Sequence, residues 1–257
     1  MSNFEQVVIC MPVYNEADGI EEFLVEIDGS MSGNLVVVIV DDASKDSTLS
    51  VIRSIKFQNI SLLIKENEMN LGHGSSTIRA LSTAAELSPQ WVVAVDGDGQ
   101  IGANDILRLI STARESGADI IEGARHSRSD AWFRRFITIS TRFLCTVRSA
   151  KGVKDANTPF RVYRTPALES LLKVTPSHSP TPNLWMTVIS RLLELNVMTV
   201  EIEARPRRGL VSTGTTWGRN RKILPSKRLI KFCANAFLRW FKDWPEVRSG
   251  VNTAIAE

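Results

Sequence analysis

Two aspartates in the segment Asp96-Gly-Asp-Gly-Gln100 are the residues whose type and spacing most directly suggest chemistry. They follow the apolar residues 91–95, which predict a buried strand. Because side chains alternate along an extended chain, Asp96 and Asp98 are expected on the same side of it. Mg²⁺ and Mn²⁺ are commonly held by one or two carboxylates together with water and substrate phosphate. The segment therefore predicts a divalent-metal site, although an ordinary Asp-Gly turn has the same pattern.

The elements that position these aspartates are predicted from the apolar pattern. Strands are expected at residues 7–11, 35–40, 60–64, 91–95 and 119–123, and helices at 18–28, 47–55, 75–87 and 104–116, with Asn104 capping the last. Continuous apolar strands that alternate with helices indicate a parallel sheet covered on both faces. Ligands bind such sheets at the carboxyl ends of the strands.

Polar clusters follow four of the expected strands, at residues 12–16, 41–46, 70–74 and 96–100. Because parallel strands end at the same edge of a sheet, these four clusters are expected to form one composite site. This coincidence is a stronger argument for a binding site than any of the clusters taken alone.

Charge is distributed unevenly along the 257 residues, although the net charge is only +3. Residues 1–120 carry 7 Lys and Arg against 18 Asp and Glu, a net of −11, and residues 121–257 carry 24 against 10, a net of +14. An acidic half suits metal binding, and a basic half suits phosphates or an anionic membrane surface. No recognised nucleic-acid motif accompanies the basic residues, so nucleic acid is not an expected partner.

Composition also indicates the compartment. Cys10, Cys145 and Cys233 form no CxxC pair, which argues against a zinc site or a disulfide framework. Residues 1–5 lack the basic and apolar regions of a signal peptide, and no apolar run reaches the roughly 18 residues of a spanning helix. We therefore expect a cytoplasmic protein, peripheral at the cytoplasmic face of a membrane if it binds one.

Two basic amphipathic helices are expected in the second half, at residues 131–147 and 226–244. The second divides the chain into a domain of residues 1–225 and a C-terminal helix and tail of residues 226–257. Two interpretations remain open for it: a helix that rests on anionic lipid, or a helix whose apolar stripe docks on the core.

Five motifs in order resemble a known family. They are Met11-Pro-Val-Tyr-Asn-Glu16, Asp41-Asp-Ala-Ser-Lys-Asp-Ser-Thr48, Asn70-Leu-Gly-His-Gly74, Asp96-Gly-Asp-Gly-Gln100 and Asp155-Ala-Asn-Thr-Pro-Phe-Arg161. Together they are similar to the inverting glycosyltransferases of family 2, and most similar to the polyprenyl-phosphate sugar transferases of the dolichyl-phosphate mannose synthase type. The resemblance implies a single GT-A domain, Rossmann-like, with a mostly parallel central sheet flanked by helices and followed by the C-terminal amphipathic helix.

The resemblance also implies roles for individual residues. A nucleotide-sugar donor would be bound by Pro12, Tyr14, Asn15, Glu16, Val40, Asp42, Gly72, Asp96, Gly97, Asp98, Arg125 and Arg207. Mg²⁺ or Mn²⁺ would be held by Asp96, Asp98 and Gln100, and the acceptor side would contain Asp155 and Arg161. Asp98, Arg125 and Asp155 are the expected catalytic residues.

The acceptor remains open between a polyprenyl phosphate and a hydroxyl group of a saccharide or other molecule. Asp155 is either a general base for a hydroxyl or a structural residue, which forms an ion pair with Arg161 or caps a turn. A phosphate monoester, with a second pKa of about 6, needs no base, and the many arginines favour it. A nucleotidyltransferase and a non-catalytic nucleotide-sugar binder are the less favoured alternatives.

Overall fold

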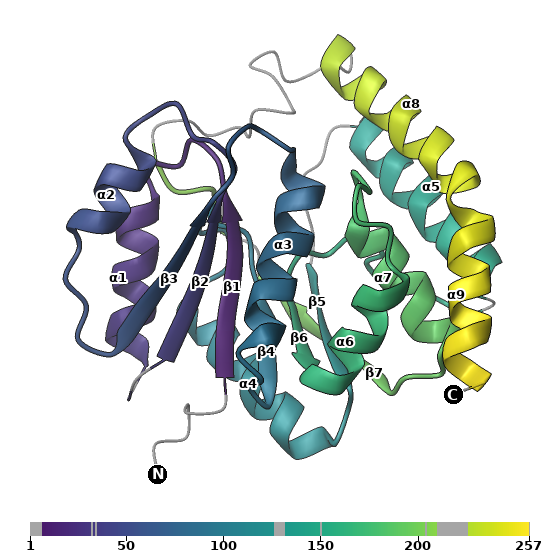
Figure 1. Ribbon diagram of the computed structural model, residues 1–257, viewed down its shortest axis with the longest axis horizontal. Coiled ribbons are helices and arrows are strands. Elements are labelled where there is room, and N and C mark those ends of the chain that lie inside the picture. The colour runs from purple at the N-terminus through teal and green to yellow at the C-terminus, as the bar shows by residue number, and fades with distance from the viewer. Residues whose placement is uncertain are drawn as a thin grey trace.

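A computed structural model describes residues 7–31, 33, 35–125, 132–149, 151–203, 205–209 and 226–256, and at residues 125 and 132–135 it describes the backbone alone. Within these residues, seven strands form one sheet in the order β3-β2-β1-β4-β6-β5-β7. Neighbouring strands are parallel except at β6, which runs antiparallel to β4 and β5. The predicted α/β class, with a mostly parallel sheet flanked by helices, is confirmed (Figure 1).

Strands and helices alternate along most of the chain. The strands are β1 (Val7–Val13), β2 (Leu35–Asp41), β3 (Ile60–Glu66), β4 (Trp91–Ala94), β5 (Ile120–Arg125), β6 (Arg161–Arg164) and β7 (Val197–Ile202). The helices are α1 (Ile20–Ser30), α2 (Thr48–Ser54), α3 (His73–Glu86), α4 (Ala103–Ser116), α5 (Trp132–Ser149), α6 (Thr165–Val174), α7 (Pro182–Leu192), α8 (Lys227–Lys242) and α9 (Trp244–Ala256).

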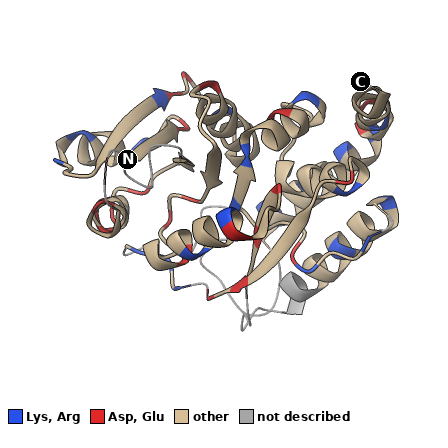
Figure 2. Cartoon of the chain, turned by 90° about the horizontal axis from the view of Figure 1, so that it is seen from below, with Lys and Arg blue, Asp and Glu red and all other residues tan. Residues whose placement is uncertain are grey.

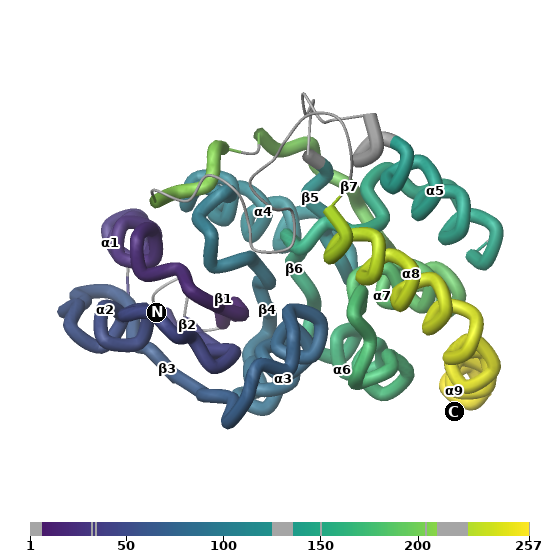
Figure 3. The backbone as a smooth tube through the Cα atoms, turned by 90° about the horizontal axis from the view of Figure 1, so that it is seen from above, coloured from purple at the N-terminus to yellow at the C-terminus, as the bar shows by residue number. Residues whose placement is uncertain are grey.

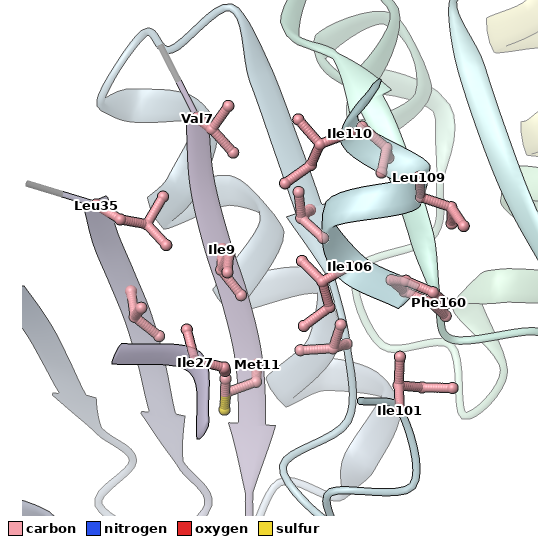
Figure 4. Close-up of a cluster of buried hydrophobic side chains, with 14 of the residues drawn as sticks. Val7, Ile9, Met11, Ile27, Leu35, Ile101, Ile106, Leu109, Ile110 and Phe160 are labelled. Carbon is pink, nitrogen blue, oxygen red and sulfur yellow. The ribbon is translucent and has the colours of Figure 1, made fainter. Parts of the chain in front are cut away.

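Each face of the sheet carries its own hydrophobic core. Ile9 and Met11 of β1 pack on one face with side chains from α1 and α4, such as Ile27 and Ile106 (Figure 4). The neighbouring residue Cys10 belongs to the core on the other face, which α3, α6 and α7 cover. Because consecutive strand residues point to opposite faces, a central strand buried on both faces must be apolar throughout.

Several helix boundaries differ from the predicted ones by one to three residues, and two of them have clear local reasons. Helix α4 begins at Ala103 after Gly102, so Asn104 lies inside the helix and the expected Asn104 cap is wrong. Helix α7 begins at Pro182, within residues 176–183, where three prolines predict a loop. A proline is suited to the first turn of a helix, because the amide hydrogen it lacks has no partner there.

The C-terminal region forms two helices where the sequence predicted one helix and a tail. The side-chain hydroxyl of Ser226 caps α8 by accepting from the backbone N–H of Leu229 at 3.1 Å. Helix α9 starts at Trp244, directly before Pro245. A proline inside a continuous helix would remove a hydrogen bond and clash with the carbonyl four residues earlier, so the chain starts a new helix here.

Within the described part of the chain, none of the helices is long and apolar enough to cross a bilayer.

The packing of α1 allows a test of the hydrophobic core on the side of the sheet that α1 and α4 cover. Phe23 is 0% exposed and Val25, two residues later, is 51% exposed. We expect Phe23→Ala to lower the free energy of unfolding by about 3–5 kcal/mol, because it leaves a cavity beneath the sheet. Val25→Ala is the matched control and should change it by no more than about 0.5 kcal/mol. Urea unfolding of both variants measures the difference, and equal losses would contradict the packing described.

Candidate active site

The loops that follow β1 and β2 are joined by hydrogen bonds at the edge of the sheet where the parallel strands end. The N–H of Asn15 donates to Oγ of Ser44 at 3.0 Å, and Oδ1 of Asn15 accepts from the N–H of Lys45 at 2.8 Å. The N–H of Glu16 donates to Oγ1 of Thr48 at 2.8 Å. Asn15 therefore positions both loops, and Tyr14 beside it is half-buried.

Asp42 connects the end of β2 to the loop before α3. Its buried carboxylate accepts from the N–H of Leu71 at 2.8 Å, from the N–H of Gly72 at 2.9 Å and from Nδ2 of Asn67 at 2.8 Å. Gly72 has a φ of +88°, in the region that favours glycine. The observed role of Asp42 is therefore to shape this loop, and the contact with a donor remains a prediction.

At this edge of the sheet, the sequence-based predictions did not anticipate the positions of Val40 and Asn67. The side chain of Val40 is fully buried in the core beneath α3, so any contact of this residue with a donor would involve its backbone. Asn67 was not among the predicted site residues. Its Nδ2 donates to Asp42 and to Oγ of Ser76 at 2.9 Å, and its position directly after β3 is the signal that could have identified it.

The two aspartates after β4 face the same small region. The side chain of Asp96 is 32% exposed, and its Oδ1 lies 3.6 Å from Nε2 of His73 at the start of α3. Oδ1 of Asp98 accepts from the N–H of Gln100 at 3.1 Å. Burial and the neighbouring charge of Asp96 raise the pKa of Asp98 to about 6.

The carboxylate oxygens of Asp96 and Asp98 suit a divalent cation that also binds oxygens of a ligand. Two carboxylates in a partly dry site repel each other, and a cation would remove that repulsion. Among the residues that the structure describes, no group of three or more His, Cys, Asp or Glu could hold a metal ion alone. Mg²⁺ and Mn²⁺ usually complete their coordination with water and phosphate, so a site of two carboxylates is sufficient for them.

Glycines let the chain pass closely around these aspartates. A Cβ atom at Gly97 would lie 2.6 Å from Cγ1 of Val13 and 3.2 Å from the carbonyl oxygen of Pro12. Gly99 has a φ of +65°, and a Cβ there would lie 2.6 Å from Cδ of Arg208. Pro12 and Gly97 thus bring the ends of β1 and β4 into direct contact.

Residues 205–209 lie against the loop of the two aspartates. The N–H of Arg205 donates to the carbonyl of Gln100 at 2.8 Å, and the N–H of Arg208 donates to the carbonyl of Asp98 at 3.2 Å. The guanidinium of Arg208 also pairs with Glu22, at 2.9 Å, and with Glu26 of α1. The role of Arg205 and Arg208 in securing this segment was not predicted. The spacing of Glu22 and Glu26, one turn apart on α1, is the signal for it.

Arg207 brings a positive charge into the acidic region. Its guanidinium pairs with the carboxylate of Glu16, and each side chain is 13% exposed. Burial raises the pKa of Glu16 to about 7, although Arg207 opposes the shift, and the charges of Asp98 and Asp96 add to it. Glu16, Asp98 and Arg207, which are far apart in the sequence, therefore share one electrostatic environment.

The side chains predicted for the acceptor side are held by other contacts. Oδ1 of Asp155 accepts from the N–H of Asn157 at 3.3 Å. The fully buried guanidinium of Arg161 donates to the carbonyl of Thr158 at 3.1 Å and to Oγ1 of Thr187 at 2.6 Å. Arg161 thus ties this loop to α7 from inside the protein. Its acceptor-side role and that of Asp155 remain predictions. Arg125, a further predicted site residue, ends β5, but its side chain lies outside the described part of the structure.

A buried charge network supports this side of the sheet. Glu122 of β5 is 2% exposed and accepts from both terminal nitrogens of Arg191, at 2.8 and 2.6 Å. One terminal nitrogen of Arg161 lies 3.5 Å from the same carboxylate. The carboxylate of Glu122 therefore interacts with two buried guanidinium groups. The sequence pattern did not predict this shared interaction.

This network yields a second test. We expect Glu122→Ala to lower the free energy of unfolding by about 3–5 kcal/mol, because it removes the carboxylate that lies against both buried arginines. The control is Glu66→Ala, which removes an exposed partner of Arg53 and should cost less than about 1 kcal/mol. Urea unfolding of the two variants distinguishes them, and a small loss for Glu122→Ala would show that water reaches the network.

The chain is similar in sequence to known proteins. Residues 8–172 match the family described as Glycosyl transferase family 2. Two similar proteins are undecaprenyl-phosphate 4-deoxy-4-formamido-L-arabinose transferases. The one from Proteus mirabilis is 26% identical over 212 residues, and the one from Edwardsiella ictaluri is 27% identical over 210 residues. In both cases the match covers 79% of this chain and 63% of the relative, so the chain spans less than two thirds of their length.

Solved structures share the fold. Glucosyl-3-phosphoglycerate synthase from Mycobacterium tuberculosis, in complex with Mn²⁺, UDP-glucose and glycerol 3-phosphate, is 17% identical with a TM-score of 0.64, covering 93% of this chain and 79% of that one. TarS residues 1–349 from S. aureus are 19% identical with a TM-score of 0.54, covering 77% and 59%.

Proposed function

This chain belongs to glycosyl transferase family 2, and we propose that it transfers a sugar, with inversion, from a nucleotide-sugar donor to a polyprenyl phosphate. The observation that carries the proposal is the pair of carboxylates, Asp96 and Asp98, at the edge where the loops after β1, β2 and β3 also meet. In a parallel sheet this edge is where ligands bind. The names of the sequence relatives, which are undecaprenyl-phosphate sugar transferases, support the choice of acceptor.

The donor is proposed to lie across the loops that follow β1 and β4. Half-buried Tyr14 offers an aromatic ring to a nucleobase, and Glu16 offers a carboxylate to a ribose hydroxyl. The side chains of Asp42 and Asn15 support Tyr14 and Glu16 indirectly, because they hold the surrounding loops in place.

The diphosphate of the donor is proposed to lie at Asp96 and Asp98. These carboxylates, with Gln100 nearby, would hold Mg²⁺ or Mn²⁺, which supplies charge stabilisation for the leaving diphosphate. The Mn²⁺ in the complex of the structurally similar synthase supports this choice. Arg207, within the same electrostatic environment, is placed to exchange its pairing with Glu16 for a phosphate oxygen.

A phosphate acceptor can act as a nucleophile with little or no assistance from a general base. A phosphate monoester is largely ionised at neutral pH, since its second pKa is about 6. The attacking oxygen forms a bond to the anomeric carbon while the bond from that carbon to the diphosphate oxygen breaks, which inverts the configuration. With no proton to remove from the acceptor, Asp155 would not need to act as a base, and its contact with the N–H of Asn157 shapes the loop of the acceptor side. Because the proposed acceptor is a lipid, we propose that the protein acts peripherally at the cytoplasmic face of a membrane.

Loss of the metal-binding carboxylate is the first functional test. We expect Asp98→Asn to lower metal-dependent hydrolysis and transfer of the donor by about 10²–10³-fold, because charge on the leaving diphosphate loses its stabilisation. The control is Asp105→Asn in α4, whose carboxylate pairs with Arg108 at 3.5 Å and should leave the rate near that of the wild type. Turnover of a panel of nucleotide sugars with Mn²⁺ or Mg²⁺ measures both. Wild-type rates in Asp98→Asn would refute the assignment.

The proposed role of Arg207 predicts a change in donor affinity. We expect Arg207→Ala to raise the KM for the donor by about 10–100-fold, the equivalent of one hydrogen bond to a charged group. Arg108→Ala is the control, because this half-exposed side chain pairs with Asp105 at 3.5 Å within α4, away from the aspartates. Steady-state kinetics with both variants give the comparison. Equal KM values would show that Arg207 makes no contact with the donor.

The acceptor is tested separately with the active donor identified in the panel. Transfer to undecaprenyl phosphate, and none to undecaprenol or to soluble saccharides, is the expected result. Transfer only to a hydroxyl acceptor would replace this proposal with the alternative in which Asp155 is the general base.

A further inference from the structure

Helices α5 and α8 expose apolar side chains that no other described part of the chain covers. Each of these residues is between 53% and 69% exposed, and together we call them the α5/α8 surface: Phe136, Ile139, Phe143, Val147, Ile230, Phe237, Leu238 and Phe241. The two helices run side by side at one end of the molecule (Figures 1 and 3). Apolar surface gathered in this way marks an interaction site more often than scattered residues do.

The exposed residues of α5 form a stripe on the outer side of the helix. Phe136, Phe143 and Val147 recur at seven and four residues, which keeps them on one helical face. Cys145, on the opposite face, is fully buried, and its Sγ lies 3.9 Å from the carbonyl of Leu184 in α7. The inner face of α5 thus already packs on the core, and the stripe is additional to it.

Helix α8 shows the same division. Leu229 and Trp240 are buried, and the ring of Trp240 stacks on Trp185 of α7 with centroids 4.3 Å apart. Arg148 of α5 donates to the carbonyl of Trp240 at 3.1 Å and joins the two helices near their C-terminal ends. Docking on the core, one of the two interpretations of this helix, is therefore observed, and Phe237 and Phe241 remain exposed all the same.

Charge identifies what could cover the α5/α8 surface. The sequences of α5 and α8 contain nine Lys and Arg and no Asp or Glu: Arg134, Arg135, Arg142, Arg148, Lys227, Arg228, Lys231, Arg239 and Lys242. Figure 2 shows the Lys and Arg residues of the described chain in blue and the Asp and Glu residues in red. A second copy of the chain would bring the same charges face to face. Residues 210–225 would also add like charge, since they contain three basic and no acidic residues.

We propose that the α5/α8 surface binds the anionic headgroup layer of a lipid bilayer, with its aromatic and aliphatic side chains inserted below the headgroups. Amphipathic helices with basic residues beside an apolar face bind such membranes, and each basic residue near the surface adds about fivefold to the affinity. Both helices begin on the side of the sheet where the parallel strands end (Figure 1), so binding there brings the candidate active site toward the bilayer.

The inference deepens the proposed function and rests on it, because the proposed lipid acceptor is the reason for the protein to bind a membrane. Its test needs neither donor nor acceptor. Full-length protein is sedimented with vesicles of phosphatidylcholine, with or without 30 mol% phosphatidylglycerol, at about 0.1 M and 0.5 M salt. We expect binding to the anionic vesicles alone, and weaker binding at the higher salt concentration.

Two double variants locate the contact. Phe143→Asn with Phe237→Asn removes one exposed ring from each helix and should lower the partition coefficient at least about tenfold. Val25→Asn with Leu87→Asn is the matched control, because both residues are exposed, at 51% and 44%, on other elements. Its partition coefficient should equal that of the wild type.

Several results would overturn the inference. They are wild-type protein that does not bind anionic vesicles, equal binding by the two double variants, or a dimer in solution that Phe143→Asn with Phe237→Asn dissociates while vesicle binding is absent. Metal-dependent donor hydrolysis, measured on the same samples, separates these outcomes from a failure of the proposed function. Hydrolysis that persists without vesicle binding would refute only the membrane contact.

Discussion

The repulsion between partly buried carboxylates is the constraint around which the candidate active site is organised. Burial together with the charge of Asp96 raises the pKa of Asp98, and Glu16 from another loop adds to the same negative potential. Such a cluster is costly unless positive charge compensates for it. Arg207 supplies part of that compensation through its pairing with Glu16, and a cation with a diphosphate is the ligand whose charges suit the remainder.

The sheet makes this concentration of charge possible. The apolar β1, β2 and β4 are parallel neighbours and end at one edge, so the acids that follow them converge there. Secondary contacts then fix the loops. Asp42 accepts from the backbone of Leu71 and Gly72, and Gly97 allows β4 to approach β1 closely. The rigid part of the site is therefore built by residues that a ligand need not touch.

The second half of the chain has a different electrostatic character. Under the acceptor side, Glu122 is shared by Arg161 and Arg191 in the interior, where removing one charge would leave the others uncompensated. On the outside, α5 and α8 carry only basic charges beside an exposed apolar stripe. A nucleotide-sugar site at the edge of the sheet and a lipid-facing surface beside it would allow one enzyme to join a soluble donor to a membrane-bound acceptor.

The sequence by itself determined the alternation of elements, the mostly parallel sheet and the position of the polar clusters at the strand ends, because these follow from local apolar periodicity and chain direction. It also predicted that Asp96 and Asp98 lie close together, since the two carboxylates are two residues apart in the chain. It did not determine that Asp42 turns inward to hold a loop, that Arg161 is buried, or that Arg207 meets Glu16. These depend on contacts between residues up to 191 positions apart, which local patterns do not encode. Only the tertiary structure decided that α8 docks on Trp185 and still exposes an apolar stripe, because a helical wheel shows that a face is apolar and not what covers it.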